Sequence, residues 1–135
     1  MKKEVIVAVS GYFDPLHVGH IDYLELAACL GDRLVVIINN DHQAQLKKGK
    51  SFMQESDRMR IIGSLRCVDE VCLSIDKDAT VCETLRILKP DIFAKGGDRF
   101  SSEVPEAQLC WEIGIDMIDG LGMKIRSSSE FTGLK

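Results

Sequence analysis

The chain has 135 residues and a mass of 15.0 kDa, a length that favours a single domain spanning residues 1–135. Hydrophobic residues make up 45% of the chain and charged residues 28%, which are ordinary globular values that exclude a disordered or collagen-like protein. The formal net charge of −4 argues against a basic surface for nucleic acid.

Short apolar runs alternate with helical patterns along the whole chain. The runs have the continuous apolar character of strands that are buried on both faces. In chain order, the predicted elements are a strand at 4–9, a helix at 17–30, a strand at 33–38, a polar loop at 39–51, a helix at 54–65, a strand at 70–74, a helix at 80–88, a strand at 91–94, a turn at 95–98, a helix at 103–113, a strand at 115–118 and a tail at 119–135.

This alternation predicts an α/β fold, in which a doubly wound parallel sheet of five strands carries helices on both faces. Ligands bind such sheets beyond the carboxyl ends of the strands, near the point where the strand order reverses. The segments expected to form a site are therefore the loops at 10–17, 39–51, 95–102 and 119–129.

The sequence indicates no membrane-spanning segment, no disulfide framework and no zinc site. No apolar run reaches the ~18–20 residues that a membrane span needs, and the N-terminus lacks the apolar core of a secretory signal. The five cysteines form no Cys-x-x-Cys pair, so they indicate neither a zinc site nor a disulfide framework. We expect a cytoplasmic protein with reduced thiols and no membrane partner.

Two histidines follow the first predicted strand. His17 and His20 are three residues apart, so they share one face of the helix that begins there. Gly19 lies between them and leaves room for a ligand to approach the backbone. The free N–H groups of the helix N-terminus and two imidazoles predict a phosphate site, where both rings stabilise charge during attack on a phosphorus atom.

The stretch Gly11-Tyr12-Phe13-Asp14-Pro15-Leu16-His17-Val18-Gly19-His20 resembles the His-x-Gly-His motif of the cytidylyltransferase-like nucleotidylyltransferases. The resemblance spans nearly the whole chain. It implies a Rossmann-like sheet and the transfer of NMP from an NTP to a phosphate-bearing acceptor, with release of pyrophosphate and no covalent enzyme intermediate. It also implies nucleotide-binding roles for Gly11, Tyr12, Phe13, Asp14 and Gly19. Tyr12 departs from the family, whose members usually have Thr, Ser or Cys there.

Basic residues precede and enter the second predicted helix. The family resemblance implies that Lys47 or Lys50 holds the triphosphate or the acceptor phosphate, and Lys47 is assigned to the catalytic set. Arg58 shares a helix face with apolar residues, so it needs a partner. A buried carboxylate is the structural alternative and a phosphate the functional one; we place Arg58 with His17 and His20 as a candidate catalytic residue.

Two later segments complete the candidate site. Lys95-Gly96-Gly97-Asp98 follows the fourth strand and resembles the heptose-phosphate adenylyltransferase branch more than the glycerol-phosphate cytidylyltransferase branch. Lys95, Gly97 and Asp98 are therefore candidate nucleotide ligands. Near the C-terminus, Ser127, Ser128 and Ser129 resemble the family's serine and threonine segment. The family arginine before it is missing, and Lys124 or Arg126 is the candidate substitute for binding the substrate phosphate.

The sequence thus predicts a nucleotidylyltransferase that uses ATP or CTP and a sugar- or polyol-phosphate. Mg²⁺ would arrive with the NTP, and no metal site of the protein's own is expected. Because relatives are commonly homodimers, a homodimer is expected here. The alternative is a non-catalytic nucleotide-binding module or sensor, which would bind an NTP without releasing pyrophosphate.

Overall fold

The computed structural model of the protein describes residues 3–49, 52–96 and 105–121. Within these ranges, five parallel strands form one sheet in the order β3-β2-β1-β4-β5. The strands are β1 (Ile6–Gly11), β2 (Arg33–Ile38), β3 (Glu70–Leu73), β4 (Ile92–Gly96) and β5 (Asp116–Leu121). The order reverses between β1 and β4, which confirms the predicted doubly wound sheet.

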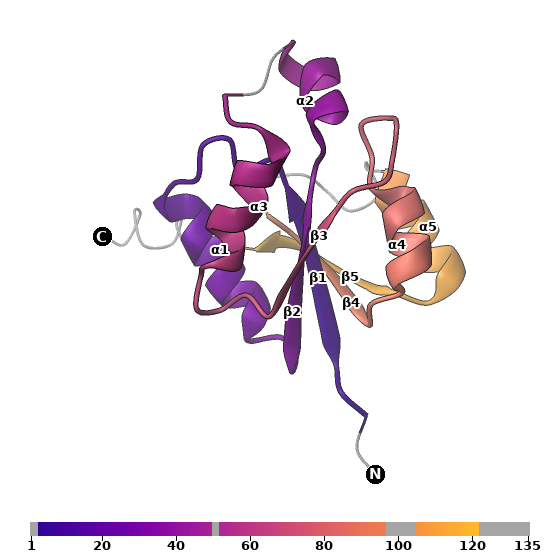
Figure 1. Ribbon diagram of the computed structural model, residues 1–135. Coiled ribbons are helices and arrows are strands. Elements are labelled where there is room, and N and C mark those ends of the chain that lie inside the picture. The colour runs from indigo at the N-terminus through magenta and orange to yellow at the C-terminus, as the bar shows by residue number, and fades with distance from the viewer. Residues whose placement is uncertain (1–2, 50–51, 97–104, 122–135) are drawn as a thin grey trace, which may run out of the picture.

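Helices cover both faces of the sheet (Figure 1). In that view α1 and α3 lie on one side, α4 and α5 lie on the other, and α2 stands beyond the carboxyl end of β2. The helices are α1 (Val18–Ala28), α2 (Asp41–Lys48), α3 (Glu55–Gly63), α4 (Cys82–Leu88) and α5 (Pro105–Ile113). Apart from α2, each element was predicted from the sequence, with ends that shift by at most three residues.

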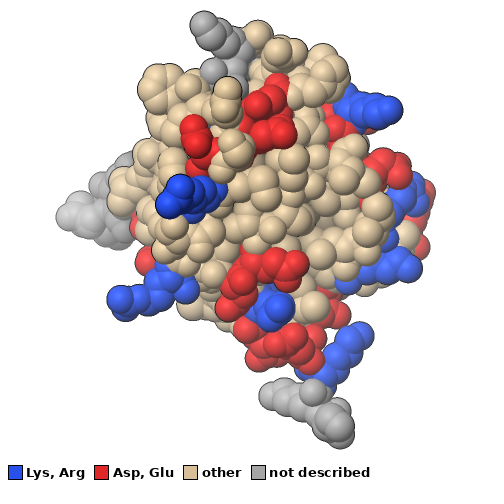
Figure 2. Space-filling view, viewed as in Figure 1, with Lys and Arg blue, Asp and Glu red and all other residues tan. Residues whose placement is uncertain are grey.

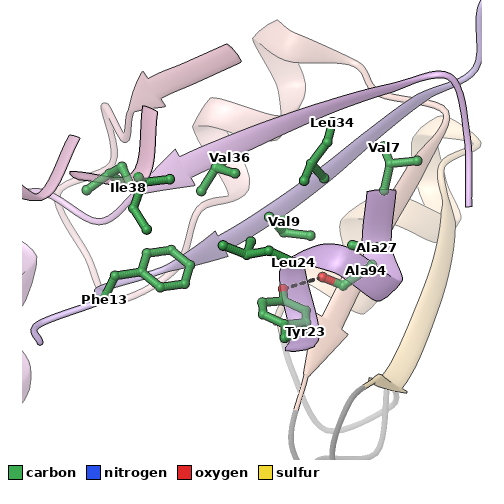
Figure 3. Close-up of a cluster of buried hydrophobic side chains, with 11 residues drawn as sticks. Val7, Val9, Phe13, Tyr23, Leu24, Ala27, Leu34, Val36, Ile38 and Ala94 are labelled. Atoms are coloured by element: carbon green, nitrogen blue, oxygen red, sulfur yellow. Dashed lines mark hydrogen bonds between the residues drawn. The ribbon is translucent and has the colours of Figure 1, made fainter. Parts of the chain in front are cut away.

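Strand alternation divides the core into two clusters, one on each face of the sheet. Val7 and Val9 of β1 point into the first cluster, which α1 and α3 cover, whereas Ala8 points into the second, which α4 and α5 cover. Figure 3 shows the first cluster, in which the Tyr23 hydroxyl donates a 2.6 Å hydrogen bond to the carbonyl of Ala94 on β4. This bond joins α1 to β4 across the point where the strand order reverses.

Gly31 follows α1 for a packing reason. A Cβ atom at this position would lie 2.7 Å from Val7 Cγ2 and 2.8 Å from the carbonyl oxygen of Val5. Real Cβ atoms do not approach other atoms so closely, so only glycine allows the chain to pass this near to β1. The chain then enters β2 directly beside β1, where Ile6 is paired with Arg33.

The predicted loop at 39–51 is wrong over most of its length, because residues 41–48 form α2. The helix is closed at its start by a capping box: Asn40 Oδ1 accepts from Gln43 N at 2.8 Å, and Gln43 Oε1 accepts from Asn40 N at 2.9 Å. Gly49 ends it with φ near 79°, a left-handed conformation that glycine adopts readily. Local capping therefore makes a helix from a polar segment that has no apolar stripe.

The face of the molecule shown in Figure 2 has mixed charge. On the face shown in Figure 2, Lys and Arg side chains lie singly or in small groups with Asp and Glu side chains near them. None of the helices that the structure describes has the length and apolar character needed to cross a membrane.

Candidate active site

The segment between β1 and α1 places both histidines at the start of a helix. His17 is the N-cap residue of α1 and has extended backbone angles, and its Nδ1 accepts a hydrogen bond from Gly19 N at 3.1 Å. His20 Nδ1 accepts from His17 N, also at 3.1 Å. The two imidazoles thus form a reciprocal capping box, the role that serine and glutamate commonly fill.

This capping arrangement fixes the tautomer of each ring. A ring nitrogen that accepts a hydrogen bond carries no proton, so a neutral imidazole here carries its proton on Nε2. Burial, together with the nearby His17, lowers the pKa of His20 to about 4, so His20 is neutral near pH 7. The Nε2–H groups of the two rings therefore remain as hydrogen-bond donors for a ligand.

The two rings are held together by stacking. Their centroids are 3.8 Å apart with an interplanar angle of 24°, and Phe13 meets His20 edge-on with a centroid distance of 5.1 Å. A Cβ atom at Gly19 would lie 3.0 Å from His17 Cε1 and 3.2 Å from His17 Nδ1. Gly19 therefore makes room for the His17 ring in this conformation.

Phe13 packs against His20 and is itself buried. Its side chain is 3% exposed, its φ is 51°, and a Cβ atom at Gly11 would lie only 2.7 Å from its Cζ. The sequence prediction placed both Gly11 and Phe13 in contact with the nucleotide. The buried Phe13 ring packs over Gly11 in this conformation, and a nucleotide contact at these two positions stays a prediction.

Asp14 ties the histidine loop to the segment before α3. Its carboxylate oxygens accept hydrogen bonds from Phe52 N at 2.6 Å and Met53 N at 2.7 Å. The sequence prediction assigned Asp14 to nucleotide binding. The structure shows that its carboxylate also has a structural task, since it closes the loop onto a segment almost forty residues later.

Arg58 takes the carboxylate alternative that the sequence left open. Its side chain is completely buried, and Nη2 donates to Asp41 Oδ1 at 2.7 Å. Nη1 donates to the carbonyls of Tyr12 at 3.0 Å and Asn39 at 2.7 Å, and Nε donates to the carbonyl of Met53 at 3.1 Å. The sequence prediction placed Arg58 in the catalytic set; in this conformation its guanidinium has no exposed surface and holds the loops of the site together.

Lys47 lies on α2 and reaches back to the loop after β1. Its Nζ is 4.7 Å from the centroid of the Tyr12 ring, within the range of a cation–π interaction. Lys95, at the carboxyl end of β4, has its Nζ 5.8 Å from the Phe93 ring centroid. Both lysines thus belong to the carboxyl edge of the sheet, on the two sides of the point where the strand order reverses.

Several predicted site residues lie outside the described part of the chain. They are Lys50, Gly97, Asp98, Lys124, Arg126, Ser127, Ser128 and Ser129. Apart from Lys95 on β4, the structure brings the remaining candidates together from β1, the loop after it, the start of α1, α2 and α3. Among the described residues, no group of three or more His, Cys, Asp or Glu side chains could hold a metal ion.

Sequence reasoning missed the residues that attach α2 to α3 and to the loop between β3 and α4. Asp41 pairs with Arg58, and the completely buried Gln43 donates from Nε2 to the carbonyls of Asp78 at 2.8 Å and Thr80 at 2.7 Å. It also missed a hollow of about 530 Å³ at the ends of β2 and β3, lined by residues 73–77 with Asn40, His42 and Glu55. The spacing of Asn40 and Gln43, which matches a helix start, was the signal that could have indicated α2.

Comparison with known proteins identifies a family and relatives that agree with one another. A family model described as cytidylyltransferase-like matches residues 8–119. The chain is 39% identical over 117 residues to the bifunctional protein HldE of Hydrogenovibrio crunogenus and 41% identical over 112 residues to HldE of Helicobacter pylori. These alignments cover 84% and 82% of this chain but 24% of each relative, so the chain spans about a quarter of their length.

A solved structure supports the same grouping. The lipopolysaccharide core biosynthesis protein from Thermoplasma volcanium superposes with a TM-score of 0.75 at 30% sequence identity. The match covers 87% of this chain and 96% of that protein. The two proteins therefore share the fold over most of this chain and almost all of that protein.

Proposed function

Because this chain belongs to the cytidylyltransferase-like family, we propose that it is a nucleotidylyltransferase. It would transfer the nucleoside monophosphate of an NTP to a sugar- or polyol-phosphate and release pyrophosphate. The likeness to the Thermoplasma volcanium protein, a lipopolysaccharide core biosynthesis protein, supports a sugar-phosphate acceptor. The Lys95-Gly96-Gly97-Asp98 sequence favours ATP as the nucleotide, with CTP as the alternative.

The stacked His17–His20 pair is the observation that carries this proposal. In the proposed reaction, a phosphate oxygen of the acceptor attacks the α-phosphorus, and the bond from that phosphorus to the bridging oxygen breaks. The electron pair of that bond leaves with pyrophosphate. Negative charge on the equatorial oxygens is then stabilised by the Nε2–H donors and by the N-terminal end of α1.

Lys47 and Mg²⁺ would act on the rest of the triphosphate. A lysine ammonium at the edge of the site attracts the phosphate oxygens as a point charge. Mg²⁺ would enter bound to the NTP and neutralise part of its charge, since it binds phosphates and water more readily than protein cages. Arg58 and Asp14 would hold the loops that carry these groups.

We also propose a homodimer in the cytoplasm. The support for association is the pair of large apolar side chains exposed on α4 and α5, Ile87 at 73% and Trp111 at 84%. Sedimentation equilibrium tests the dimer: a molecular mass near 15.0 kDa at micromolar concentration would contradict it.

Pyrophosphate release tests the activity. The purified protein is incubated with Mg²⁺, each of the four NTPs and a panel of sugar and polyol phosphates, and one matched pair is expected to release pyrophosphate. The variants His17→Ala and His20→Ala should lower kcat by about 10²–10³-fold, because each removes one charge-stabilising donor. Gln108→Ala is the control, since Gln108 is an exposed residue on α5 and should leave kcat unchanged.

Two outcomes would contradict the proposal. Near-normal turnover in the His17→Ala or His20→Ala variant would contradict the mechanism. NTP binding measured by calorimetry, without pyrophosphate release for any acceptor in the panel, would favour the non-catalytic module.

A further inference from the structure

We infer that Tyr12 is a positioning residue, whose ring holds the ammonium group of Lys47 at the carboxyl edge of the sheet for contact with the NTP phosphates. This inference rests on the proposed function, which assigns the phosphate contact to Lys47. It gives Tyr12, for which the family resemblance implied a direct nucleotide contact, a role that acts through the lysine.

The geometry between the two side chains carries the inference. Lys47 is exposed on α2, and a lysine side chain in water samples many rotamers. Its Nζ lies 4.7 Å from the centroid of the Tyr12 ring, inside the ~6 Å limit for a cation–π interaction. The ring therefore favours the subset of rotamers that turns the ammonium toward the loop carrying His17 and His20.

Tyr12 is itself well placed to act as a platform. Its carbonyl accepts a hydrogen bond from the buried Arg58, and its hydroxyl lies 3.4 Å from the carbonyl oxygen of Gln43 on α2. The hydroxyl contact is long and therefore weak. The ring thus bridges the histidine loop and the helix that carries Lys47, and its face is the main contact it offers to the lysine.

The chemistry of the contact is that of a neutral ring. Burial is the largest cause that raises the pKa of the Tyr12 hydroxyl, so the phenol stays protonated near pH 7. The ammonium is consequently attracted by the negative face of the ring and not by a phenolate. A Thr, Ser or Cys at position 12 offers no such face, so this way of holding Lys47 depends on the aromatic residue.

A double-mutant cycle tests the inference, with inorganic tripolyphosphate binding measured by calorimetry as a readout that does not require catalysis. Tyr12→Leu should weaken binding about 3- to 10-fold, as expected for the loss of a cation–π contact. Tyr12→Phe, which keeps the ring and loses the hydroxyl, should stay within about 2-fold of the wild type. In a Lys47→Met background, Tyr12→Leu should change the affinity by less than about 2-fold, because the group that it positions is gone.

Ring fluorination keeps the test decisive if Tyr12→Leu does not fold. Replacing Tyr12 with phenylalanine and then with phenylalanines carrying one, two and three ring fluorines preserves the shape but withdraws electrons from the ring face. Affinity for tripolyphosphate should fall stepwise along this series, whereas a purely structural role would leave it level. A level series, or equal effects of Tyr12→Leu with and without Lys47, would overturn the inference.

These results separate the inference from the proposed function. Coupled tripolyphosphate affinities without pyrophosphate release from any NTP would contradict the activity and support the role of Tyr12. Pyrophosphate release with uncoupled affinities would support the activity and overturn the role of Tyr12. A wild-type protein that does not bind tripolyphosphate would also overturn it.

Discussion

His17 and His20 each use their two ring nitrogens for different purposes. Nδ1 accepts a backbone N–H and thereby closes the start of α1, so this nitrogen serves the fold. Nε2 is left for a ligand, so the other nitrogen serves the chemistry that we propose. Because the cap requires an unprotonated Nδ1, the fold itself selects the tautomer that donates from Nε2.

Gly19→Ala should disturb the stack without unfolding the protein. The added Cβ would lie 3.0 Å from His17 Cε1, so the ring must move by a few tenths of an ångström or more. We expect kcat to fall about 10- to 100-fold, since small displacements of catalytic groups are costly. The unfolding free energy should change by less than about 1 kcal/mol, because the higher helix propensity of alanine offsets the strain.

Gly63→Ala is the matched control for this prediction. A Cβ atom there would lie 3.4 Å from Val71 Cγ2, which is an ordinary contact, and Gly63 is the last residue of α3. This variant should be more stable by about 0.5 kcal/mol in urea unfolding and should keep its turnover. If Gly19→Ala kept full turnover, the His17 ring would not need the position that the structure gives it.

The lowered pKa of His20 predicts a loss of stability in mild acid. The pKa is about 4 in the folded protein and 6.5 for an ordinary histidine, so the unfolded chain takes up the proton first as the pH falls. The stabilising contribution is complete above about pH 6.5, declines between pH 6.5 and pH 4, and falls no further below that range.

His20→Gln isolates this effect from the titration of the carboxylates. Glutamine at the third helical position can still accept from His17 N, as in an ordinary capping box, but it does not titrate. Urea unfolding at pH 7 and pH 5 should therefore show a larger loss of stability for the wild type than for His20→Gln. Equal losses in the two proteins would mean that His20 has the same proton affinity in the folded and unfolded states.

The sequence predicted the local placement of the candidate site residues better than their long-range contacts. His17, Gly19 and His20 lie together at a helix start as their spacing indicated, because that spacing is local. The contacts of Tyr12 with Lys47 and of Asp14 with Met53 join residues more than thirty positions apart. Such contacts depend on how loops pack, which residue spacing in one sequence does not determine.

Arg58 connects the elements that surround the site. Its guanidinium binds the carbonyl of Tyr12 after β1, the carbonyl of Asn39 after β2 and the carboxylate of Asp41 at the start of α2. One buried cation thus donates hydrogen bonds to acceptors from three segments. Without it, these acceptors would lack this hydrogen-bond donor. The planar fork of an arginine suits this task, whereas the single ammonium of a lysine does not.

Arg58→Met should therefore destabilise the whole arrangement. It leaves the buried Asn39 carbonyl and the partly buried Tyr12 and Met53 carbonyls without this donor, and we expect a loss of about 3 kcal/mol or more in urea unfolding. Arg58→Lys should recover only part of this loss. Asp41→Asn should cost about 1 kcal/mol or less, because the Asp41 side chain is 38% exposed and asparagine keeps an acceptor oxygen. A change below 1 kcal/mol for Arg58→Met would contradict the role of Arg58 as a connecting residue.

The error at α2 shows what hydrophobic patterning leaves out. Residues 41–48 carry no apolar stripe, so a search based on periodicity assigns them to a loop. The helix depends instead on the Asn40–Gln43 capping box, on Gly49 at its end and on the buried Gln43 amide. Capping signals therefore deserve as much weight as periodicity for short helices at the edge of a sheet.

The arrangement of the whole molecule followed from the sequence more reliably than its details. The residues of β2 are buried at almost every position. A strand buried on both faces has a continuous apolar run, and such a run predicts a central strand of a parallel sheet. Alternation with helices then leaves few topologies, and these place the loop ends at one edge of the sheet. The strand order could not be predicted, because the residue pattern of a strand does not determine which strands lie next to it in the sheet.

Nucleotide binding should stabilise the whole molecule, because the proposed site draws residues from several elements. A ligand that binds only the folded state adds about 2.7 kcal/mol at a concentration 100 times its Kd. For a domain of this size, that corresponds to an increase of roughly 10 °C in Tm.

We expect this increase with Mg²⁺-ATP or Mg²⁺-CTP in a thermal unfolding experiment. The nucleotide that gives the larger shift at equal concentration identifies the preferred base. Lys47→Met should reduce the shift, whereas Lys89→Met, at an exposed lysine that follows α4, should leave it unchanged. If none of the four NTPs raised Tm at millimolar concentration, the carboxyl edge of the sheet would not be a nucleotide site.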